Sequence, residues 1–555
     1  MSSRCRISRT PPSGKIITPD QIVKSPMPAL SRRNLLKVGG LSAAALAAIG
    51  SATWVPERIA RAMPLSFPDI QFDIGAFVHP AQTINGIPVQ FGVTFTFLAP
   101  ATLTRTPSRN DQAVLDEALE TIEAVFPFSP GGIFTFVAYG IPYFNRLPGS
   151  IVASTVPRLS FNHNRFVLEE AVPSPTDVGQ PGITKATFNV PVRIEHHDVL
   201  FTMRSDSLDN ISNVFNWLQG SNNLGGFAIA SPNFDGLFSF GATRLNFVQP
   251  GLPRQLANEL NAEGVSPFTT IATEINPASS MWMGFVDQQL DSSAPNAATV
   301  TFAGANAGGS VGKLTTAVAG DYFDNGSIMH LSHDIDDLTQ FYNKDPNKFT
   351  GAEPFSERVQ YMFRSFTPNN TPGLPFPVDP NDAFTNGGGL GAPTGNLATQ
   401  QQSSFVQNIF TGPNAVFNNF DPDLLAQGTK QLRVGHEQAL QRSSRAADGT
   451  PLHIRNDGPG LSSLDVPDGS TQPTLEFMVF VPTAEFFRVM RINAASLDLV
   501  QAGQSGGTGT SIPAGVTGSA AEDDGLERFI TATRRQNFLI PPRRHRAFPL
   551  RELFS

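Results

Sequence analysis

Two segments of the sequence carry side chains suited to chemistry rather than to packing. Asp287 lies in "MWMGFVDQQLD", Met281 to Asp291, where a carboxylate follows a glycine and two apolar residues typical of a strand end. Such a carboxylate either caps a turn or transfers protons. The segment Arg433–Gly460 holds His436, His453 and four arginines just before the most apolar strand of the chain. Charged groups beside a core strand have to be solvated, ion-paired or bound to a ligand.

Three other patterns are better explained without a site. "GGSVG", Gly308 to Gly312, has the glycine and serine spacing of serine hydrolases, but no strand-to-helix turn surrounds it, which favours a glycine-rich loop. His330 and His333 have a spacing that suits metal binding on a helix, yet they lie in a strand pattern that sends them to opposite faces. The run His196–Asp198 begins a strand, and we interpret it as a solvated edge.

The composition excludes several kinds of chemistry. The chain has 555 residues, 44 of them phenylalanine, which predicts a phenylalanine-filled core in more than one domain. Its single cysteine, Cys5, lies near the N-terminus, so disulfides, thiolate catalysis and cysteine-ligated metals are not expected. Beyond the N-terminal region, no apolar run is long enough to suggest a membrane span.

Residues 1–62 differ from the rest of the chain. They contain ten lysines and arginines but only two acids, and "SRRNLLK", Ser31 to Lys37, precedes a short Ala-rich apolar run that ends at "ARA", Ala60 to Ala62. This pattern predicts a twin-arginine signal peptide cleaved after Ala62, and hence export to the periplasm or the outside of the cell. The apolar run is short for a membrane anchor, the alternative interpretation.

The charge of the predicted mature chain limits its partners. Of the 39 basic and 47 acidic residues, 29 and 45 follow residue 62, a net charge of −16. Nucleic acids and anionic lipids select basic surfaces, so neither is expected as a partner.

Strand and helix patterns divide the predicted mature chain into two similar halves, an N-terminal domain over 63–290 and a C-terminal domain over 291–555. Even-numbered apolar spacing predicts strands and capped periodic segments predict helices. In the first half the predicted elements are strands 88–100, 131–140 and 196–205 and helices 109–126 and 206–220. In the second they are strands 325–334, 474–482 and 537–542 and helices 334–343, 483–497 and 521–536. Irregular alternation favours an α+β fold with antiparallel sheets over parallel βαβ units.

The order of these parts resembles that of the dye-decolourising (DyP-type) haem peroxidases. "GFVDQQ", Gly284 to Gln289, is similar to the family's G-x-x-D-G element, and "VGH", Val434 to His436, stands where the family places its haem-ligating histidine. "HIRNDGPG" followed by "TLEFMVFVP" is similar to the segment that carries the family's distal arginine, here Arg455. The resemblance implies two ferredoxin-like halves with antiparallel sheets and peripheral helices, as in the dimeric α+β barrel superfamily.

The resemblance also implies roles for individual residues. His436 would be the axial ligand of the iron of one haem b per chain, and Gly284 and Phe285 would lie against the porphyrin. Asp287 would move the proton of hydrogen peroxide, and Arg455 would stabilise negative charge and contact the haem. The implied function is an exported haem peroxidase that uses hydrogen peroxide to oxidise an organic electron donor, with the twin-arginine export machinery as a further partner.

Some residues depart from the family pattern or remain open. Gln288 replaces the glycine that follows the distal aspartate, which adds a side chain beside the porphyrin. Asp448 is a candidate to orient His436 by its spacing, and His453 is a rival axial ligand. The alternatives are a non-catalytic exported protein that binds haem or another ligand with the same fold, and a structural or adhesive surface protein.

Oxidation of large donors would require a redox-active side chain near the surface. The candidates in the predicted mature chain are its tryptophans and tyrosines, for which packing is the expected role: Trp217, Trp282, Tyr139, Tyr143, Tyr322, Tyr342 and Tyr361.

Overall fold

The computed structural model describes residues 67–80, 82–84, 87–89, 92–174, 176–249, 251–275, 280–283, 296–306, 314–342, 453–494 and 529–555. The predicted signal peptide and parts of both predicted domains therefore lie outside the described residues. Within these ranges, no helix combines the length and the apolar character needed to cross a membrane.

The N-terminal half forms a four-stranded antiparallel sheet with two helices. In chain order its main elements are β3 (Phe95–Leu103), α3 (Arg109–Val125), β4 (Phe134–Tyr139), β8 (Val199–Ser205), α6 (Leu208–Leu218) and β10 (Arg244–Phe247). The strands lie in the order β10-β3-β8-β4, and every neighbouring pair is antiparallel. This is a β-α-β-β-α-β unit of the ferredoxin-like type.

The C-terminal half repeats this arrangement. Its main elements are β11 (Ser327–Asp336), α9 (Leu338–Phe341), β13 (Gly458–Ser462), β14 (Gln472–Val481), α15 (Ala484–Ala494) and β15 (Ile530–Ile540). Its strand order β15-β11-β14-β13 matches the order β10-β3-β8-β4 of the first half element by element, again with antiparallel neighbours. The two-residue strand β12 (Ile454–Arg455) also pairs with β14.

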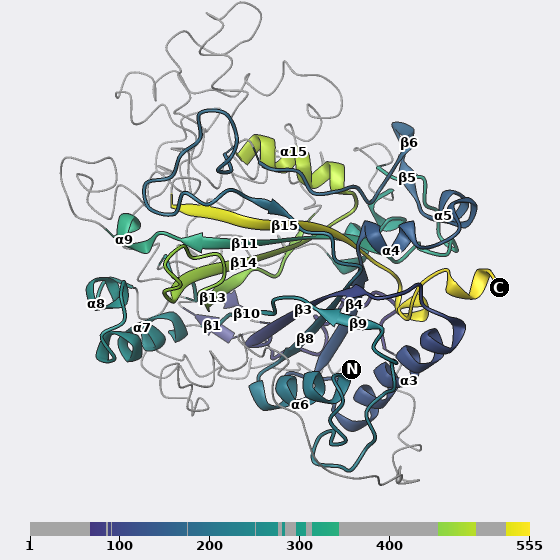
Figure 1. Ribbon diagram of the computed structural model, residues 1–555, viewed down its shortest axis with the longest axis horizontal. Helices are drawn as coiled ribbons and strands as arrows, with labels where there is room; N and C mark the ends of the chain where they lie inside the picture. The colour runs from purple at the N-terminus through teal and green to yellow at the C-terminus, as the bar shows by residue number, and fades with distance from the viewer. Residues whose placement is uncertain are drawn as a thin grey trace, which may run out of the picture.

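The two sheets join at both edges and close on themselves. Leu539 of β15 pairs with Tyr139 of β4 at one seam, and Asn246 of β10 pairs with Gly460 of β13 at the other. The helices lie outside this closed sheet, with α3 and α6 beside the first half and α15 beside the second (Figure 1). The predicted α+β fold class, with antiparallel sheets and peripheral helices, is confirmed.

Helix α3 shows why the sequence forms a helix at this point. Ser108 caps it by accepting a hydrogen bond from the backbone N–H of Asp111, whose carboxylate accepts one from the backbone N–H of Ser108. Leu115, Leu119 and Ile122 recur at helical spacing and are buried against the sheet. Helix α6 begins in the same way, with Ser207 as its cap.

Strand alternation divides the core into an outer layer under the helices and an interior layer within the closed sheet. The interior layer is apolar in one part and has these buried members: Phe72, Leu98, Phe136, Ala138, Leu200, Ala297, Val300, Met329, Leu331, Met478, Phe480, Phe538 and Ile540. Other interior positions of the same strands carry polar or charged side chains, among them Arg204, Arg244, Glu476 and Arg534.

One prediction about local structure is wrong and another holds only in part. The helix predicted over 521–536 is contradicted by β15, because Ile530 to Gln536 are extended and pair with β11. In the run His196–Asp198, His196 is exposed as predicted, but Asp198 is fully buried and accepts hydrogen bonds from Arg146 at 2.6 and 3.1 Å. In both places distant strands and charges override the local pattern.

Smaller elements complete the fold. They are β1 (Gln82–Ile84), β2 (Ile87–Val89), α4 (Ile141–Asn145), α5 (Gly149–Thr155), β5 (Arg158–Leu159), β6 (Asn162–Phe166), β7 (Arg193–Ile194), β9 (Phe238–Phe240), α7 (Leu252–Ala262), α8 (Phe268–Ile271), η2 (Ala297–Val300), η3 (Gly304–Asn306), η7 (Arg543–His545) and η8 (Arg551–Leu553). Of these, β7 pairs in parallel with β15 near the seam between β15 and β4.

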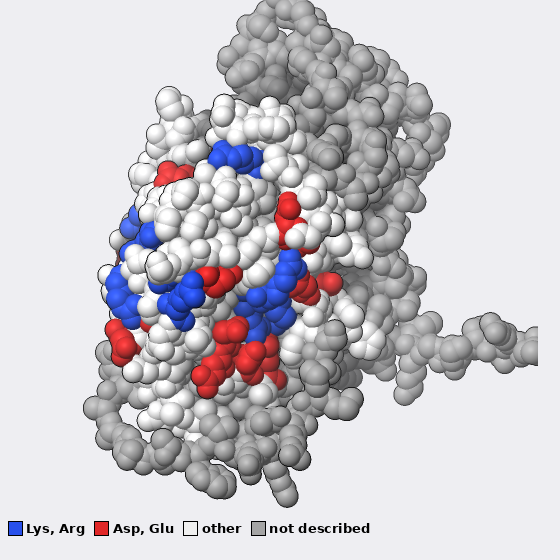
Figure 2. Space-filling model, turned by 90° about the vertical axis from the view of Figure 1, so that its right-hand side faces the viewer, with Lys and Arg blue, Asp and Glu red and all other residues white. Residues whose placement is uncertain are grey.

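The face near the C-terminus carries charges of both signs. Figure 2 shows basic and acidic side chains side by side on a largely uncharged surface. In the C-terminal segment, Arg544 forms ion pairs with both Asp69 and Asp324. Because these pairs are partly exposed, each contributes little to stability.

Candidate functional site

The structure describes one of the five predicted site residues. Gly284, Phe285, Asp287 and His436 lie outside the described residues, and so do Gln288 and Asp448. Their proposed roles stay predictions.

Arg455 is half-buried on β12, where it pairs with Val479 of β14. Because directly paired residues share one face of a sheet, Arg455 lies on the outer face, while its neighbour Ile454 packs against the interior core.

Arg455 stands at the end of a row of side chains across the outer face of the C-terminal half. Val479 pairs with His330 of β11, and His330 pairs with Asn537 of β15. The His330 ring is fully inside the protein and stacks on Phe487 of α15, with 4.0 Å between ring centroids. This row therefore extends from Arg455 to the part of the sheet that α15 covers.

His330 is held by polar neighbours on both sides of its ring. Its Nδ1 lies 2.7 Å from Asn537 Oδ1 and its Nε2 lies 3.0 Å from Ser332 Oγ. Burial, helped by the positive charge of Arg535, holds the pKa of His330 well below its ordinary value. The ring is therefore neutral at physiological pH and acts as a fixed hydrogen-bonding group.

Two buried aspartates continue the same face of β11. Burial raises the pKa of Asp334 to about 6, although Arg535 and Arg491 oppose the rise. Burial and the charge of Asp334 raise the pKa of Asp336 well above its ordinary value, and within the described part of the chain Asp336 Oδ1 has no hydrogen-bond partner. Asp334 exchanges its proton near pH 6. The outer face can therefore take up and release protons close to neutrality.

A buried ion pair connects this face to the loop between β6 and β7, which contains Asp177. Arg535 donates to Asp177 through Nε and Nη2, both at 2.8 Å, and its Nη1 donates to Ser332 at 3.0 Å. The two ionic partners are 4% and 3% exposed, so removal of either would leave an uncompensated buried charge. The pair fixes the position of Ser332 and, through it, of His330.

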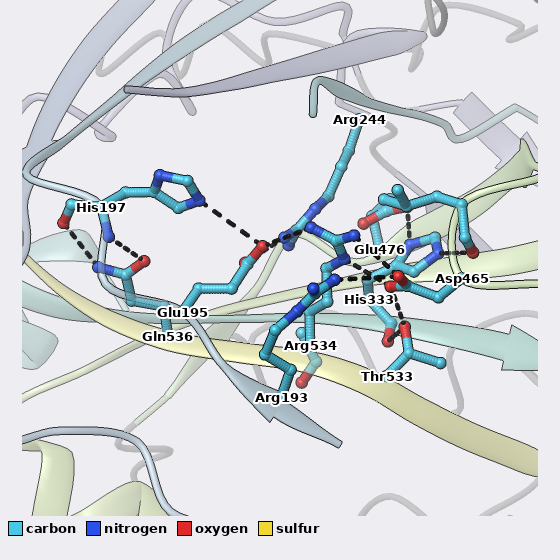
Figure 3. A network of polar contacts seen from close by, with 12 residues as sticks. Arg193, Glu195, His197, Arg244, His333, Asp465, Glu476, Thr533, Arg534 and Gln536 are labelled. Atoms are coloured by element: carbon cyan, nitrogen blue, oxygen red, sulfur yellow. Dashed lines mark hydrogen bonds and ion pairs between the residues drawn. The ribbon is translucent and has the colours of Figure 1, made fainter. Parts of the chain in front are cut away.

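A second polar network lies inside the closed sheet (Figure 3). Arg244 of β10 reaches Glu195, which also accepts a hydrogen bond from Arg534 of β15 at 2.9 Å. Arg534 in turn donates to Asp465 at 2.5 and 2.8 Å. Burial opposes ionisation of Glu195, yet the charges and hydrogen bonds of Arg244 and His197 together outweigh it and lower the pKa of this carboxyl. The network links a strand of the first half to one of the second.

His333 belongs to the interior network and not to the face that holds His330. Its Nδ1 lies 2.6 Å from Glu476 Oε1 and its Nε2 lies 3.3 Å from the carbonyl oxygen of Leu464. The prediction that His330 and His333 point to opposite faces is confirmed. Within the described ranges, no three His, Cys, Asp or Glu side chains are grouped so as to hold a metal ion.

The tryptophans and tyrosines that the structure describes pack within the fold as predicted, and all but Tyr322 are buried. Five of the described tryptophans and tyrosines are buried: Trp217, Trp282, Tyr139, Tyr143 and Tyr342. Tyr322 is half-buried, donates to Glu552 Oε1 at 2.6 Å and stacks on His545 with 3.7 Å between ring centroids. It also lines a cavity of about 320 Å³ with Arg158 and Asp321. Tyr361 lies outside the described residues.

Sequence reasoning missed the buried aspartates Asp334 and Asp336. A signal was present: in the segment Ser327–Asp336, every second residue from His330 onward is polar, although the strand is buried on both faces. A polar stripe on a fully buried strand is unusual, since buried polar groups are costly unless they have partners. The partners themselves, such as Asp177 for Arg535, come from far along the chain and leave no local pattern.

Comparison with known proteins gives one family match over part of the chain and a set of solved structures with low sequence identity. Residues 95–363 match a family described as a family of unknown function, DUF7405. No curated protein matches the sequence. Among solved structures, one described as a DyP-type peroxidase protein of Shewanella oneidensis has 13% identity and a TM-score of 0.45, and the match covers 84% of this chain and 96% of that one.

Two further solved structures are similar to the same degree. The encapsulated DyP-type peroxidase of Mycobacterium smegmatis has 13% identity and a TM-score of 0.41, with 81% of this chain and 94% of that one covered. A variant of DypB from Rhodococcus jostii RHA1 in complex with heme has 12% identity and a TM-score of 0.40, with the same coverage. At this identity the similarity concerns the arrangement of the chain alone.

Proposed function

We propose that this protein is an exported haem peroxidase of the dye-decolourising type, which uses hydrogen peroxide to oxidise organic donors. The observation that carries the proposal is the position of Arg455. The sequence motifs assign it to the distal side of a haem, and it lies on the outer face of the C-terminal half, in one row with His330. The two ferredoxin-like halves agree with the architecture that the sequence resemblance implies.

The described residues match a haem in part. Arg455 is a permanent cation at the edge of the α15-covered face, which suits a haem propionate or the negative charge that develops on a peroxide oxygen. His330 and His333 do not suit the iron, because both ring nitrogens of each already have polar neighbours. In this proposal His436, assigned by the sequence motif, would hold the iron, with His453, buried just before β12, as the rival.

The bound haem would supply a redox-active iron. In this proposal Asp287 would move a proton between the two oxygens of hydrogen peroxide. Arg455 would stabilise negative charge that develops on an oxygen of the peroxide, and His436 would hold the iron. Asp334, with its pKa of about 6, provides a second group that exchanges protons on the same face as Arg455.

Organic donors too large for a buried pocket would react at the surface. Tyr322 is the described tyrosine best placed for this role, because it is half-buried and borders a cavity. Its hydroxyl donates to Glu552, which can accept the phenolic proton when the ring loses an electron. A Tyr322→Phe variant would then lose oxidation of large dyes and keep oxidation of small phenols.

An absorption spectrum of the protein, expressed with a haem supply, tests the proposal directly. We expect a Soret band in the wild type. The band should shift or disappear in His436→Ala, which lacks the proposed iron ligand, and should stay unchanged in Arg455→Leu and Asp287→Ala. Peroxide-dependent dye oxidation should disappear in the last two. Arg109→Leu, which removes an exposed arginine on α3, is the matched control. A protein with no Soret band would refute haem binding.

The alternative is a non-catalytic exported protein that binds haem or another ligand with this fold. Gln288, which places a side chain after Asp287, favours it. A Soret band without peroxide turnover, unchanged by Gln288→Gly, would support the binder over the enzyme. Export by the twin-arginine route is proposed on the sequence alone, and replacement of Arg32 and Arg33 by lysine should abolish it.

A further inference from the structure

Arg204 is a buried cation inside the closed sheet. It lies on β8, pairs with Thr96 of β3, and is 8% exposed. Among the described residues, its one hydrogen bond runs from Nη2 to Oδ1 of Asn456, at 2.6 Å. Asn456 follows β12 and donates its backbone N–H to Met478, which brings the C-terminal half against Arg204.

Arg204 differs from the other buried arginines that the structure describes in detail. Arg535, Arg534 and Arg244 each contact a carboxylate, whereas the one contact of Arg204 is to a neutral amide. Burial alone lowers the pKa of Arg204 to about 10, with no acid to oppose the effect. A guanidinium stays charged at physiological pH even so, and a buried charge without a counter-charge is strongly unfavourable.

Unused hydrogen-bond donors lie beside this charge. Within the described residues, Arg204 Nε and Asn456 Nδ2 are buried and have no hydrogen-bond partner. Thr202, two residues before Arg204 on the same face of β8, has a buried hydroxyl that also lacks a partner there. One unused N–H on the guanidinium and one on the neighbouring amide match an anion with several acceptor oxygens, because such an anion satisfies the charge and the donors together.

We propose that the interior of the closed sheet binds a small oxyanion, a carboxylate, phosphate or sulfate group, between Arg204 and Asn456. The anion accepts from Arg204 Nε and Asn456 Nδ2 and compensates the charge of the guanidinium. The site is separate from the proposed haem site: Asn456 faces the interior, and the preceding residue, Arg455, faces outward. It therefore holds whether or not the protein binds haem.

The test measures thermal unfolding and calorimetric binding on haem-free protein, with potassium phosphate, sulfate or acetate against chloride at equal ionic strength. The wild type should show saturable 1:1 binding and a Tm that rises by a few degrees at saturation. Arg204→Gln should lose both responses. A response to phosphate and sulfate but not to acetate identifies an inorganic oxyanion, and an equal response to acetate identifies a carboxylate ligand.

A second variant keeps the test decisive if Arg204→Gln does not fold. Asn456→Asp supplies a carboxylate beside Arg204, so it should raise Tm without added anion and abolish the response to phosphate. Asn261→Asp adds the same charge at an exposed position and is the control. A wild-type Tm that does not depend on the oxyanion, or an Asn456→Asp variant that still responds to it, overturns the proposal.

Discussion

Replacement of Asp334 by asparagine should stabilise the protein in a way that depends on pH. Asp334 is 6% exposed, and its pKa rises from the ordinary 3.8 to about 6 because burial disfavours the carboxylate. The folded protein therefore binds a proton more tightly than the unfolded chain. The contribution of Asp334 to the free energy of unfolding is therefore highest below about pH 4 and falls as the pH rises towards 6.

The size of the effect follows from the two pKa values. A rise from 3.8 to about 6 corresponds to about 3 kcal/mol between the protonated and ionised states. Asparagine has nearly the shape of a protonated aspartate and cannot ionise. Asp334→Asn should therefore raise the free energy of unfolding by up to about 3 kcal/mol at pH 8 and change it little at pH 3.5.

Urea unfolding at a series of pH values from 3.5 to 8, followed by circular dichroism, measures this difference. Asp116→Asn, at an exposed position on α3, is the matched control and should change the free energy of unfolding little at any pH. A constant difference between Asp334→Asn and the wild type across the series would show that Asp334 does not titrate as described. If Asp334→Asn were less stable than the wild type at pH 8, the Asp334 carboxylate would be stabilised by its neighbours and not destabilised by burial.

Three further predictions concern the framework of the site and can be checked by thermal or urea unfolding. Ser108→Ala removes the cap of α3 and should lower the free energy of unfolding by about 1 kcal/mol, whereas Ser108→Thr, which keeps the hydroxyl, should retain most of that free energy. Gly140→Ala should destabilise the protein markedly, because a Cβ there would lie 2.2 Å from the carbonyl oxygen of His197, and an unchanged Tm would contradict this close contact. Trp282→Ala should cost about 3–5 kcal/mol, since the indole is 1% exposed and donates to the carbonyl oxygen of Gly460 at 2.9 Å, while Trp282→Phe should retain part of that loss.

The elements that could be predicted from the sequence are those whose local signals agree with their packing. Helix α3 has both a cap at Ser108 and apolar residues at helical spacing, and β14 is a continuous apolar run. Strand β15 could not be predicted along its whole length. Its segment 530–536 is rich in residues that tolerate a helix, and only the pairing with β11 on one side and β7 on the other makes it a strand.

The candidate site was predictable only in part, for a similar reason. The motif around Arg455 is local and can be read from the sequence. The environment of Asp334 is not local: it depends on Arg535 and Asp177, which lie far apart in the chain and meet only in the folded sheet. The charge on Arg204 likewise becomes unusual only because the fold brings the amide of Asn456, and no acid, to its side.

The two seams of the closed sheet differ from the rest of it in strength. Among the described residues, each seam has one backbone pair, Leu539 with Tyr139 and Asn246 with Gly460, whereas β11 and β15 share ten. Side chains such as Arg244 and Glu195 hold the halves together across the interior. Amide hydrogens should therefore exchange slowly within each half and faster along these two lines. If the seams open in this way, the two halves separate before either half unfolds. Solvent and small ligands then enter the interior of the closed sheet through an open seam while each half stays folded.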